Sequence, residues 1–289
     1  TATANPSSVS SSSHTAGAWS NDNTVAMGWS GATDGSGSGV DGYSYEWTAS
    51  ASTIPDTTMD TTGSSVTSAP LSDGANWYFH IRTVDHAGNW NGGAVHVGPY
   101  RIDTTAPSNP TTATETHGAG NNTWQGTVSD PAFTWSGASD ESSSGVAGYY
   151  VYWGTNPSGT SSTWRTSASY DPGAVSSPGV RYLRVRTKDN AGNVSGWQTL
   201  FTFRYDGSAP SNPTSVTETH GAGNNAWQRT VGNPAFTWSG ASDGSGSGVA
   251  GYYVYWGTNS SGTSSTYRTS ASYDPGAVTS SSVSYLRVL

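Results

Sequence analysis

The sequence predicts an all-β protein made of consecutive antiparallel β-sandwiches. Apolar residues nowhere recur at i, i+3, i+4 and i+7 over three turns, which is the spacing of an amphipathic helix. Short runs that alternate polar and apolar residues occur instead, separated by Gly, Ser, Thr, Pro and Asn roughly every ten residues. One stretch, SNPTTATETHGAGNNTWQ at Ser108–Gln125, returns as SNPTSVTETHGAGNNAWQ at Ser211–Gln228. The shift of 103 positions is the length of a small domain, so we expect one sandwich per repeat.

The strands of the second repeat follow from its alternating runs. In chain order they are Thr111–Glu115, Ala132–Trp135, Tyr149–Trp153, Thr163–Ala168, Tyr182–Thr187 and Thr199–Tyr205. Because neighbouring residues on a strand face opposite ways, the alternation also predicts an inward-facing set: Phe133, Trp135, Leu183, Val185, Phe201 and Phe203. The pattern leaves open which face of Tyr149–Trp153 is buried. About seven strands per repeat is the number in an immunoglobulin-type sandwich.

The repeats divide the chain into three predicted domains, residues 1–105, 106–208 and 209–289. The first is a looser copy that departs from the pattern at Ser44 and Glu46 of its third strand. The third stops at Leu289 and lacks the run that would form its final strand. The linkers Thr104–Pro110 and Gly207–Pro213 contain two Pro each, and this stiffness predicts an extended rod.

Composition excludes several classes of protein. The chain has no Cys but 13 Trp and 16 Tyr among 289 residues, so its cores must be aromatic and free of disulfides. The formal net charge is −8 and the one Lys is Lys188, which argues against nucleic-acid binding. No run of 18 apolar residues predicts a membrane span, and the first residues do not read as a signal peptide.

Three motifs resemble a known family. These are a Trp in the second strand (Trp29, Trp135 and Trp238), the Tyr-rich third strand Tyr149–Trp153, and a run from Tyr182 to Asn193 that ends in Asp-Asn-Ala-Gly-Asn. Together they resemble fibronectin type III repeats and the related bacterial Ig-like repeats of secreted or cell-surface proteins. The resemblance covers essentially the whole chain. It implies tandem Ig/fibronectin-III-like sandwiches, a scaffold that serves as a spacer or a recognition module.

Two recurring loops begin with Asp, namely Asp140–Gly145 and Asp189–Asn193. As turn residues, Asp bonds its own backbone while Gly and Asn adopt positive φ. In the fibronectin-like topology both loops lie at the end of the sandwich where the chain enters, next to a linker Asp. The alternative to pure turn chemistry is therefore a Ca²⁺ ion that stiffens each junction. Its ligands would be Asp103, Asp140 and Asp189 at the first junction and Asp206 with Asp243 at the second.

A Trp recurs at the end of the Gly-rich loop His-Gly-Ala-Gly-Asn-Asn-x-Trp. The two copies are Trp124 and Trp227, and Trp19 is the looser counterpart. Exposed indoles would suit stacking on sugar rings, as in carbohydrate-binding modules. Indoles that cover the open end of a sandwich would instead be buried.

Catalysis has little support, so we predict no enzyme activity and no cofactor other than Ca²⁺. No Ser lies in a Gly-x-Ser-x-Gly elbow between a strand and a helix, and the His residues lack metal-ligand spacing.

We expect an extracellular or cell-surface structural or adhesive region that acts as a spacer, stalk or filament component. Its partner would be an extracellular polymer or protein, or further copies of the chain in fibres. Two alternatives stay open. One is an accessory carbohydrate-binding region of a secreted glycoside hydrolase, and the other is a filament subunit whose third sandwich is completed by a strand from a neighbour. The shortened third repeat equally fits a piece of a longer array.

Overall fold

Every regular element of the structure is a β-strand. The computed structural model describes residues 3–141 and 143–289, and within them strands β1 to β21 occur without a helix. Residues 1–2 at the start of the first predicted domain, and Ser142 in the loop Asp140–Gly145, lie outside the described residues. The predicted all-β class is confirmed. In the described part of the chain, no helix has the length and apolar character that a membrane-crossing segment needs.

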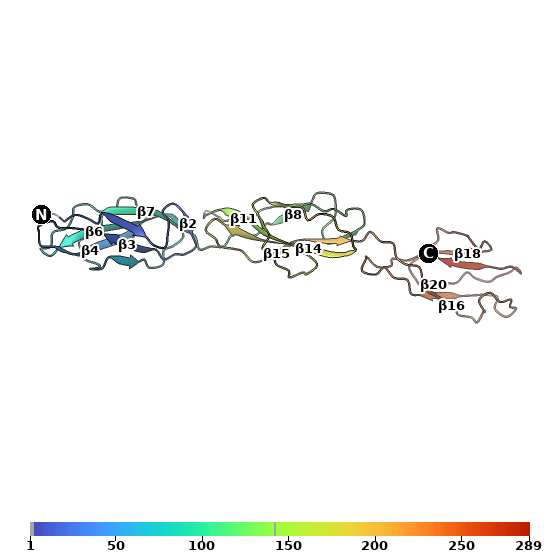
Figure 1. Ribbon diagram of the computed structural model, residues 1–289. Helices are drawn as coiled ribbons and strands as arrows, with labels where there is room; N and C mark the ends of the chain where they lie inside the picture. Colours follow the sequence, from blue (N-terminus) through green and yellow to red (C-terminus); the bar gives the residue numbers. More distant parts are fainter. Residues whose placement is uncertain (1–2, 142) are drawn as a thin grey trace. The chain divides into compact units, whose positions relative to one another are not determined.

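The first repeat forms two sheets (Figure 1). One has the order β1 (Ser8–Ser11), β3 (Ala26–Ser30) and β5 (Ser65–Thr67). The other has the order β2 (Trp19–Ser20), β7 (Val95–Ile102), β6 (Gly74–Asp85) and β4 (Val40–Thr48). The β4 and β6 strands are antiparallel from Val40 opposite Asp85 to Thr48 opposite Tyr78. The short strand β2 runs parallel to β7.

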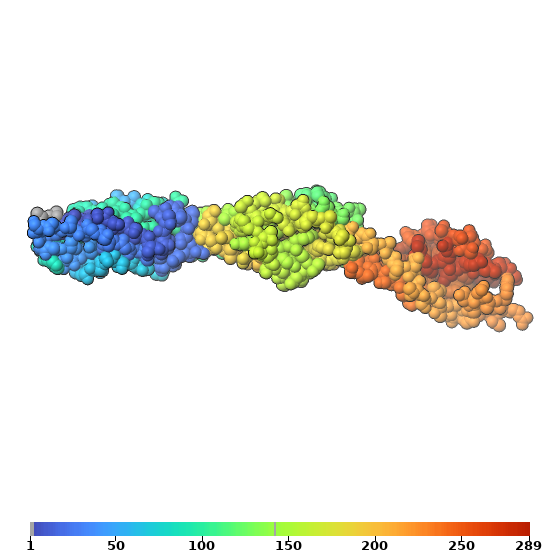
Figure 2. All heavy atoms as spheres, in the orientation of Figure 1, coloured from blue at the N-terminus to red at the C-terminus, as the bar shows by residue number. Residues whose placement is uncertain are grey.

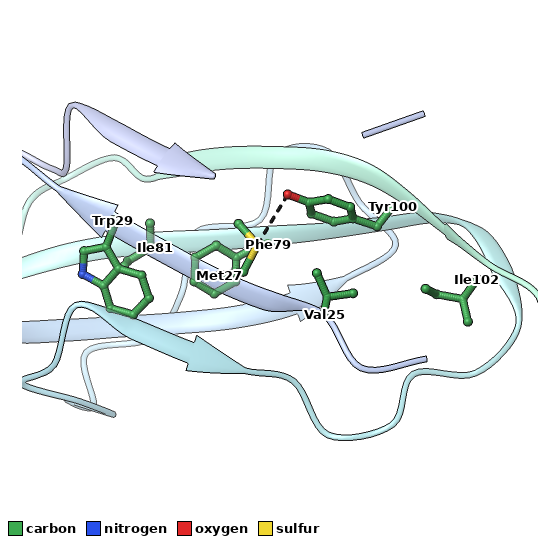
Figure 3. Close-up of a cluster of buried hydrophobic side chains, with 7 residues drawn as sticks. All are labelled: Val25, Met27, Trp29, Phe79, Ile81, Tyr100 and Ile102. Carbon is green, nitrogen blue, oxygen red and sulfur yellow. Dashed lines mark hydrogen bonds between the residues drawn. The ribbon is translucent and has the colours of Figure 1, made fainter. Parts of the chain in front are cut away.

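Apolar side chains from both sheets fill the space between them (Figure 3). Phe79 and Ile81 point inward from β6, and Tyr100 and Ile102 do so from β7. They meet Val25, Met27 and Trp29, the alternate residues at and just before β3. Burial of each such side chain stabilises the fold by about 1.5–3 kcal/mol. The Tyr100 hydroxyl donates a hydrogen bond to the Met27 sulfur at 3.4 Å, so its polar end has a partner.

The second repeat builds the same frame from eight strands. Its smaller sheet has the order β13 (Ser169–Tyr170), β10 (Phe133–Ser136), β8 (Thr112–Glu115). Its larger sheet has the order β12 (Trp164–Arg165), β11 (Val146–Gly154), β14 (Gly179–Asp189), β15 (Gln198–Tyr205), β9 (Trp124–Gln125). The predicted strand Thr163–Ala168 forms only in part, as the two-residue strand β12. Trp164 and Arg165 pair with β11, and the chain then crosses to the other sheet, where β13 pairs with β10.

The inward-facing set predicted for this repeat is confirmed. All six of its members are buried: Phe133, Trp135, Leu183, Val185, Phe201 and Phe203. The question left open for the Tyr-rich strand is settled as well. Tyr149 and Val151 are buried, so Tyr150 and Tyr152 point outward.

The third repeat contains six strands. One sheet has the order β16 (Ser215–Glu218), β17 (Phe236–Ser239), β20 (Ser272–Tyr273). The other has the order β19 (Tyr267–Arg268), β18 (Tyr252–Gly257), β21 (Tyr285–Val288). As expected from the sequence, the described residues contain no counterpart of β15 here.

By the contacts among its residues, the chain forms two compact units. One unit consists of Thr1–Thr114, Phe133–Asp171 and Tyr182–Phe201, and the other of Glu115–Ala132, Pro172–Arg181 and Thr202–Leu289. Each pair of sheets nevertheless uses one continuous stretch of sequence, as the colours of the strands in Figure 1 show. Figure 2 gives the same colours on all heavy atoms. The boundaries of the three predicted domains and the extended rod stay predictions.

Candidate functional site

Three predicted carboxylates come together in the structure. Asp103 directly follows β7, Asp140 follows the smaller sheet's strand β10, and Asp189 ends β14. One ligand oxygen from each lies within 4.8 Å of the others. Asp103 and Asp189 are buried, and Asp140 is partly buried. A linker residue and two loops therefore place three acidic groups around one point.

Asp103 is held by hydrogen bonds from both loops. Its carboxylate accepts the Ser144 backbone N–H at 3.0 Å and the N–H of Thr105 at 3.1 Å. Its carbonyl oxygen accepts the Asn193 side-chain amide at 2.7 Å. Its own N–H donates to the carbonyl oxygen of Ser20 at 2.9 Å. These bonds fix the backbone on each side of the linker residue, which the sequence alone did not indicate.

The other two carboxylates shape their own loops. Asp189 accepts the backbone N–H groups of Gly192 and Asn193 at 2.6 and 2.8 Å, together with the Asn193 amide at 2.8 Å. Asp140 accepts the N–H of Gly145 at 2.6 Å and the Ser144 hydroxyl at 3.3 Å. The turn chemistry predicted for these loops is thus present. It coexists with the convergence that a cation would need.

Electrostatics leave this cluster without a protein counter-charge. Burial raises the pKa of the Asp140 carboxyl above its ordinary value, and the neighbouring charges of Asp103 and Asp189 raise it further. Among the described residues, the ion pairs are His86 with Asp41 and His117 with Glu115, so no basic side chain pairs with the cluster. A hard cation with oxygen ligands would relieve this repulsion. Three carboxylates fit Ca²⁺ in ligand type and charge, and carbonyl oxygens or water would complete its shell of about six to eight oxygens.

A shallow depression lies beside Asp140. It is lined by Thr105, Ala106, Ser108, Ser139, Asp140, Glu141 and Ser143. Asp140 is the one member of the cluster that lines it.

The second predicted pair, Asp206 and Asp243, has a similar but looser arrangement. Asp206 accepts the N–H of Ser247 at 2.8 Å, and Asp243 accepts the N–H of Gly248 at 2.7 Å. A side chain at Gly246 would lie 2.6 Å from a carboxylate oxygen of each, so both acids surround the same glycine. In the part of the chain that the structure describes, no third acid joins them to form a cluster.

The three predicted sugar-stacking Trp residues have different surroundings. Trp19 and Trp124 are partly buried, and each has an arginine guanidinium over its ring, from Arg101 at 5.8 Å and from Arg204 at 5.6 Å. Both begin short strands that pair in parallel with the last strand of their sandwich. Trp227 is 83% exposed, and residues 227–228 form no strand. Its exposure accompanies the lack of a partner strand like β15 among the described residues.

The Gly-rich loop that carries Trp124 is organised by a buried acid. The Glu115 carboxylate accepts the backbone N–H groups of His117, Ala119 and Ala132 at 2.7–3.0 Å. Burial acts to raise the pKa of Glu115, but these hydrogen bonds outweigh it and lower the pKa below its ordinary value. This ordered loop was not foreseen from its composition.

Sequence reasoning also missed a row of basic side chains on β14. Arg184, Arg186 and Lys188 alternate with buried Leu183, Val185 and Thr187, so they share the outer face of the larger sheet. The sequence does contain a sign of this row, because a basic residue stands at every second position from Arg184 to Lys188.

Comparisons with known proteins find two relatives with similar sequences. No family model matches the chain. It is 33% identical over 189 residues to Exoglucanase B of Cellulomonas fimi, a match that takes in 65% of this chain and 16% of that protein. It is 30% identical over 214 residues to Chitinase A1 of Niallia circulans, covering 71% of this chain and 26% of that protein. The chain thus spans about a sixth and about a quarter of these relatives.

Two solved structures are similar to this chain. The fibronectin(III)-like modules of Clostridium thermocellum CbhA have a TM-score of 0.36 and 16% identity, covering 69% of this chain and 95% of that one. The chicken CNTN1 FN1–FN3 domains have a TM-score of 0.30 and 14% identity, covering 98% and 92%. At the level of the fold, the sheets described above confirm the resemblance to fibronectin III-like repeats.

Proposed function

We propose that this chain is a non-catalytic spacer region of a secreted protein, with a junction that Ca²⁺ stiffens. The observation that carries the proposal is the set of hydrogen bonds around Asp103. A freely jointed linker would leave its residues hydrated, whereas Asp103 is fully buried and bonded through its side chain and its backbone. A linker residue held in this way limits the rotation of the chain before it relative to the chain after it.

Calcium would act on the same residues. Asp103, Asp140 and Asp189 would each give a carboxylate oxygen to the ion, and neutralising their repulsion would favour the ordered arrangement of both loops. Ligands that are brought together only in the folded chain link binding to stability, so the ion would raise the melting temperature.

The host protein is proposed to be an enzyme that degrades a polysaccharide. The similarity to an exoglucanase and a chitinase supports this choice over an adhesin or a filament subunit. In such a host the chain would separate a catalytic domain from another part of the protein. Secretion follows from the same reasoning, because polymeric substrates lie outside the cell.

Small-angle X-ray scattering of the purified chain, in Ca²⁺ and in chelator, tests the spacer role. We expect Ca²⁺ to narrow the distribution of interatomic distances without changing the molecular mass. Identical curves in both conditions would remove the stiffening junction. Release of soluble sugars from cellulose or chitin by the purified chain would contradict its non-catalytic role.

A further inference from the structure

The outer face of the larger sheet in the second repeat carries a group of side chains that the spacer role does not use. We call it the cation–aromatic face and define it by Tyr150, Trp164, Arg186, Lys188 and Trp197. None of these residues belongs to the core, and none belongs to the carboxylate cluster.

Strand register sets the central row of this face. Tyr150 of β11 lies opposite Trp164 of β12 on one side and opposite Arg186 of β14 on the other. The rings of Tyr150 and Trp164 are 5.0 Å apart at their centroids, with their planes inclined at 62°. Adjacent strands are about 4.8 Å apart, so Trp164 and Arg186 are separated by about 10 Å across the sheet.

Gly148 makes room for the Trp164 indole on the sheet. A Cβ atom at Gly148 would lie 2.7 Å from the indole carbon Cζ2, too close for any other residue to be accommodated. Lys188, opposite Gly148 on β14, places its Nζ 6.0 Å from the same ring. The indole therefore lies over the backbone with a cation beside it and keeps 37% of its surface exposed.

The Arg186 guanidinium lies near two aromatic rings, and its N–H groups have no hydrogen-bond acceptor among the described residues. Its guanidinium carbon lies 4.6 Å from the Tyr150 ring centroid and 5.4 Å from that of Trp197. Within the described residues no hydrogen bond from this guanidinium is found, and its Nε atom is buried without a partner. An arginine stacked between aromatic rings is pre-oriented, and its N–H groups suit a planar, bidentate acceptor such as a carboxylate.

Charge on this face is entirely positive. The strands β11, β12 and β14 contain one acid, Asp189, which is buried and belongs to the carboxylate cluster. Among the described residues, neither Arg186 nor Lys188 forms an ion pair. The whole chain carries a net charge of −8, so attraction for a polyanion has to come from a local surface of this kind.

We propose that the cation–aromatic face binds an acidic polysaccharide, a polymer whose sugar rings carry carboxylates. One sugar ring stacks on the open side of Trp164, and the carboxylate of a nearby ring pairs with Arg186, with Lys188 beside them. The backbone separation of about 10 Å between Trp164 and Arg186 lets one polymer chain contact both side chains. A neutral polysaccharide would leave the donors of Arg186 without acceptors, and an acidic peptide would leave the indole without a ring to stack on. This proposal does not depend on Ca²⁺ or on the spacer role.

Affinity electrophoresis of the full chain in gels that contain polygalacturonate tests this proposal. Polygalacturonate is compared with its methyl ester, which has the same rings without charge, and with poly-L-glutamate, which has the charge without rings. EDTA in every gel keeps the result independent of the Ca²⁺ junction. We expect polygalacturonate to retard the chain and the other two polymers to have little effect.

Matched variants localise the binding. Arg186→Gln and Trp164→Ala should each weaken retardation about tenfold or more, and Arg186→Lys should restore part of it because charge remains without the planar fork. Arg165→Gln makes the same charge change on a residue that stacks on Tyr170 away from this face, and Trp227→Ala removes a more exposed indole. Both controls should bind like the wild type, and each variant's melting curve should confirm that it is folded.

Three results would overturn the proposal. The first is no retardation by polygalacturonate. The second is equal retardation by poly-L-glutamate or by the methyl ester, since charge or neutral sugar alone would then suffice. The third is an equal loss in the Arg165→Gln or Trp227→Ala controls, because the site would then lie elsewhere.

Discussion

The first and second sandwiches share a frame and differ in what covers their outer face. In the first, residues between β4 and β5 lie over the larger sheet. Ser44 is buried and donates to the carboxylates of Asp56 and Asp60, at 3.4 and 3.3 Å, and Arg82 donates to the carbonyl oxygen of Asp56 at 3.2 Å. Met59 lies over Gly42, where the second sandwich has Trp164 over Gly148.

In the second sandwich the corresponding face has no such covering acids. Arg186 stacks on aromatic rings instead of bonding to a loop carbonyl. The third sandwich follows the second in part, because Tyr267 lies over Gly251 and its ring is 5.4 Å from that of Tyr253. The same sandwich frame can therefore carry different surfaces, and the frame alone does not determine function. Changes in one loop and a few outward residues turn a covered face into an open, positively charged one.

The largest expected effect tests whether the two frames are equivalent. Trp29 and Trp135 are each 5% exposed, and each meets a Tyr ring at a centroid distance of 5.4 Å. Changing either to Ala should therefore lower the free energy of unfolding by a similar amount, about 3–5 kcal/mol. Differential scanning calorimetry of the two variants measures this. Clearly unequal losses would mean that the frames are not equivalent.

A smaller effect separates the Gly-rich loops of the two sandwiches. Glu115→Ala would leave three backbone N–H groups without their acceptor, at a cost of about 2–3 kcal/mol. In the first sandwich the Ser11 hydroxyl accepts the N–H groups of Ser13 and His14, so Ser11→Ala should cost about 1 kcal/mol.

Glu115 also predicts a pH dependence of stability. Because the folded pKa of Glu115 is lowered, its contribution is complete above the ordinary pKa of 4.5 and disappears as the pH falls through the folded value. Urea unfolding between pH 3 and pH 7 measures it. A stability difference between wild type and Glu115→Ala that stays constant over this range would contradict the assignment.

Acid sensitivity near neutral pH should be specific to the first sandwich. His80 is fully buried, and its Nδ1 lies 2.7 Å from Nδ1 of His96, while Nε2 lies 2.9 Å from the Thr48 hydroxyl. Burial lowers the pKa of His80, and the charge of His96 lowers it further. The stability that neutral His80 provides is therefore complete above 6.5 and is lost as the pH falls below that value.

We expect a loss of about 1 kcal/mol between pH 7.5 and pH 5, the size of one hydrogen bond. Thermal unfolding at each pH measures it, with His80→Gln as the control that should flatten the dependence. An equal response of the variant would place the titrating group elsewhere.

The smallest effect concerns the stability contributed by the open face. Arg186→Gln removes cation–π contacts of an outward-facing side chain and should cost about 0.5–1 kcal/mol. Arg82→Gln should cost more, because Arg82 also bonds to the Asp56 carbonyl and lies 5.0 Å from the Trp90 ring. Chemical denaturation of both variants gives the two values. The reverse order would indicate that Arg186 serves the fold more than a ligand.

The core could be predicted from sequence because it follows a simple period. Alternation alone identified six buried residues of the second sandwich, from Phe133 to Phe203, but it did not decide the inward face of Tyr149–Trp153. The end of β12 at Arg165 and the crossing to β13 in the other sheet could not be predicted in this way, because a crossing strand and a continuous one have the same local pattern. The bonds from Ser144 and Asn193 to Asp103 join residues up to 90 positions apart, and no local rule links them.

The carboxylate cluster was predicted for a different reason. Topology brings the linker and the two loops to the same end of the sandwich, so knowing the fold was enough to place Asp103, Asp140 and Asp189 together. The cation–aromatic face was not predicted, because its residues are far apart in the sequence and only the fold brings them together. Arg186 becomes informative only once Tyr150 and Trp197 are seen on either side of it.

Calorimetric unfolding of the wild type and of Asp140→Asn, each in Ca²⁺ and in chelator, tests the Ca²⁺ junction most directly. Ca²⁺ should raise the free energy of unfolding of the wild type by about 2.7 kcal/mol when the free Ca²⁺ concentration is one hundred times the dissociation constant of the site. It should raise that of the variant by almost nothing. In chelator the variant should be the more stable of the two, by an amount that shrinks as the pH falls and Asp140 takes up a proton, because its folded pKa is raised. Equal gains from Ca²⁺ in both proteins, or none in the wild type, would contradict the account.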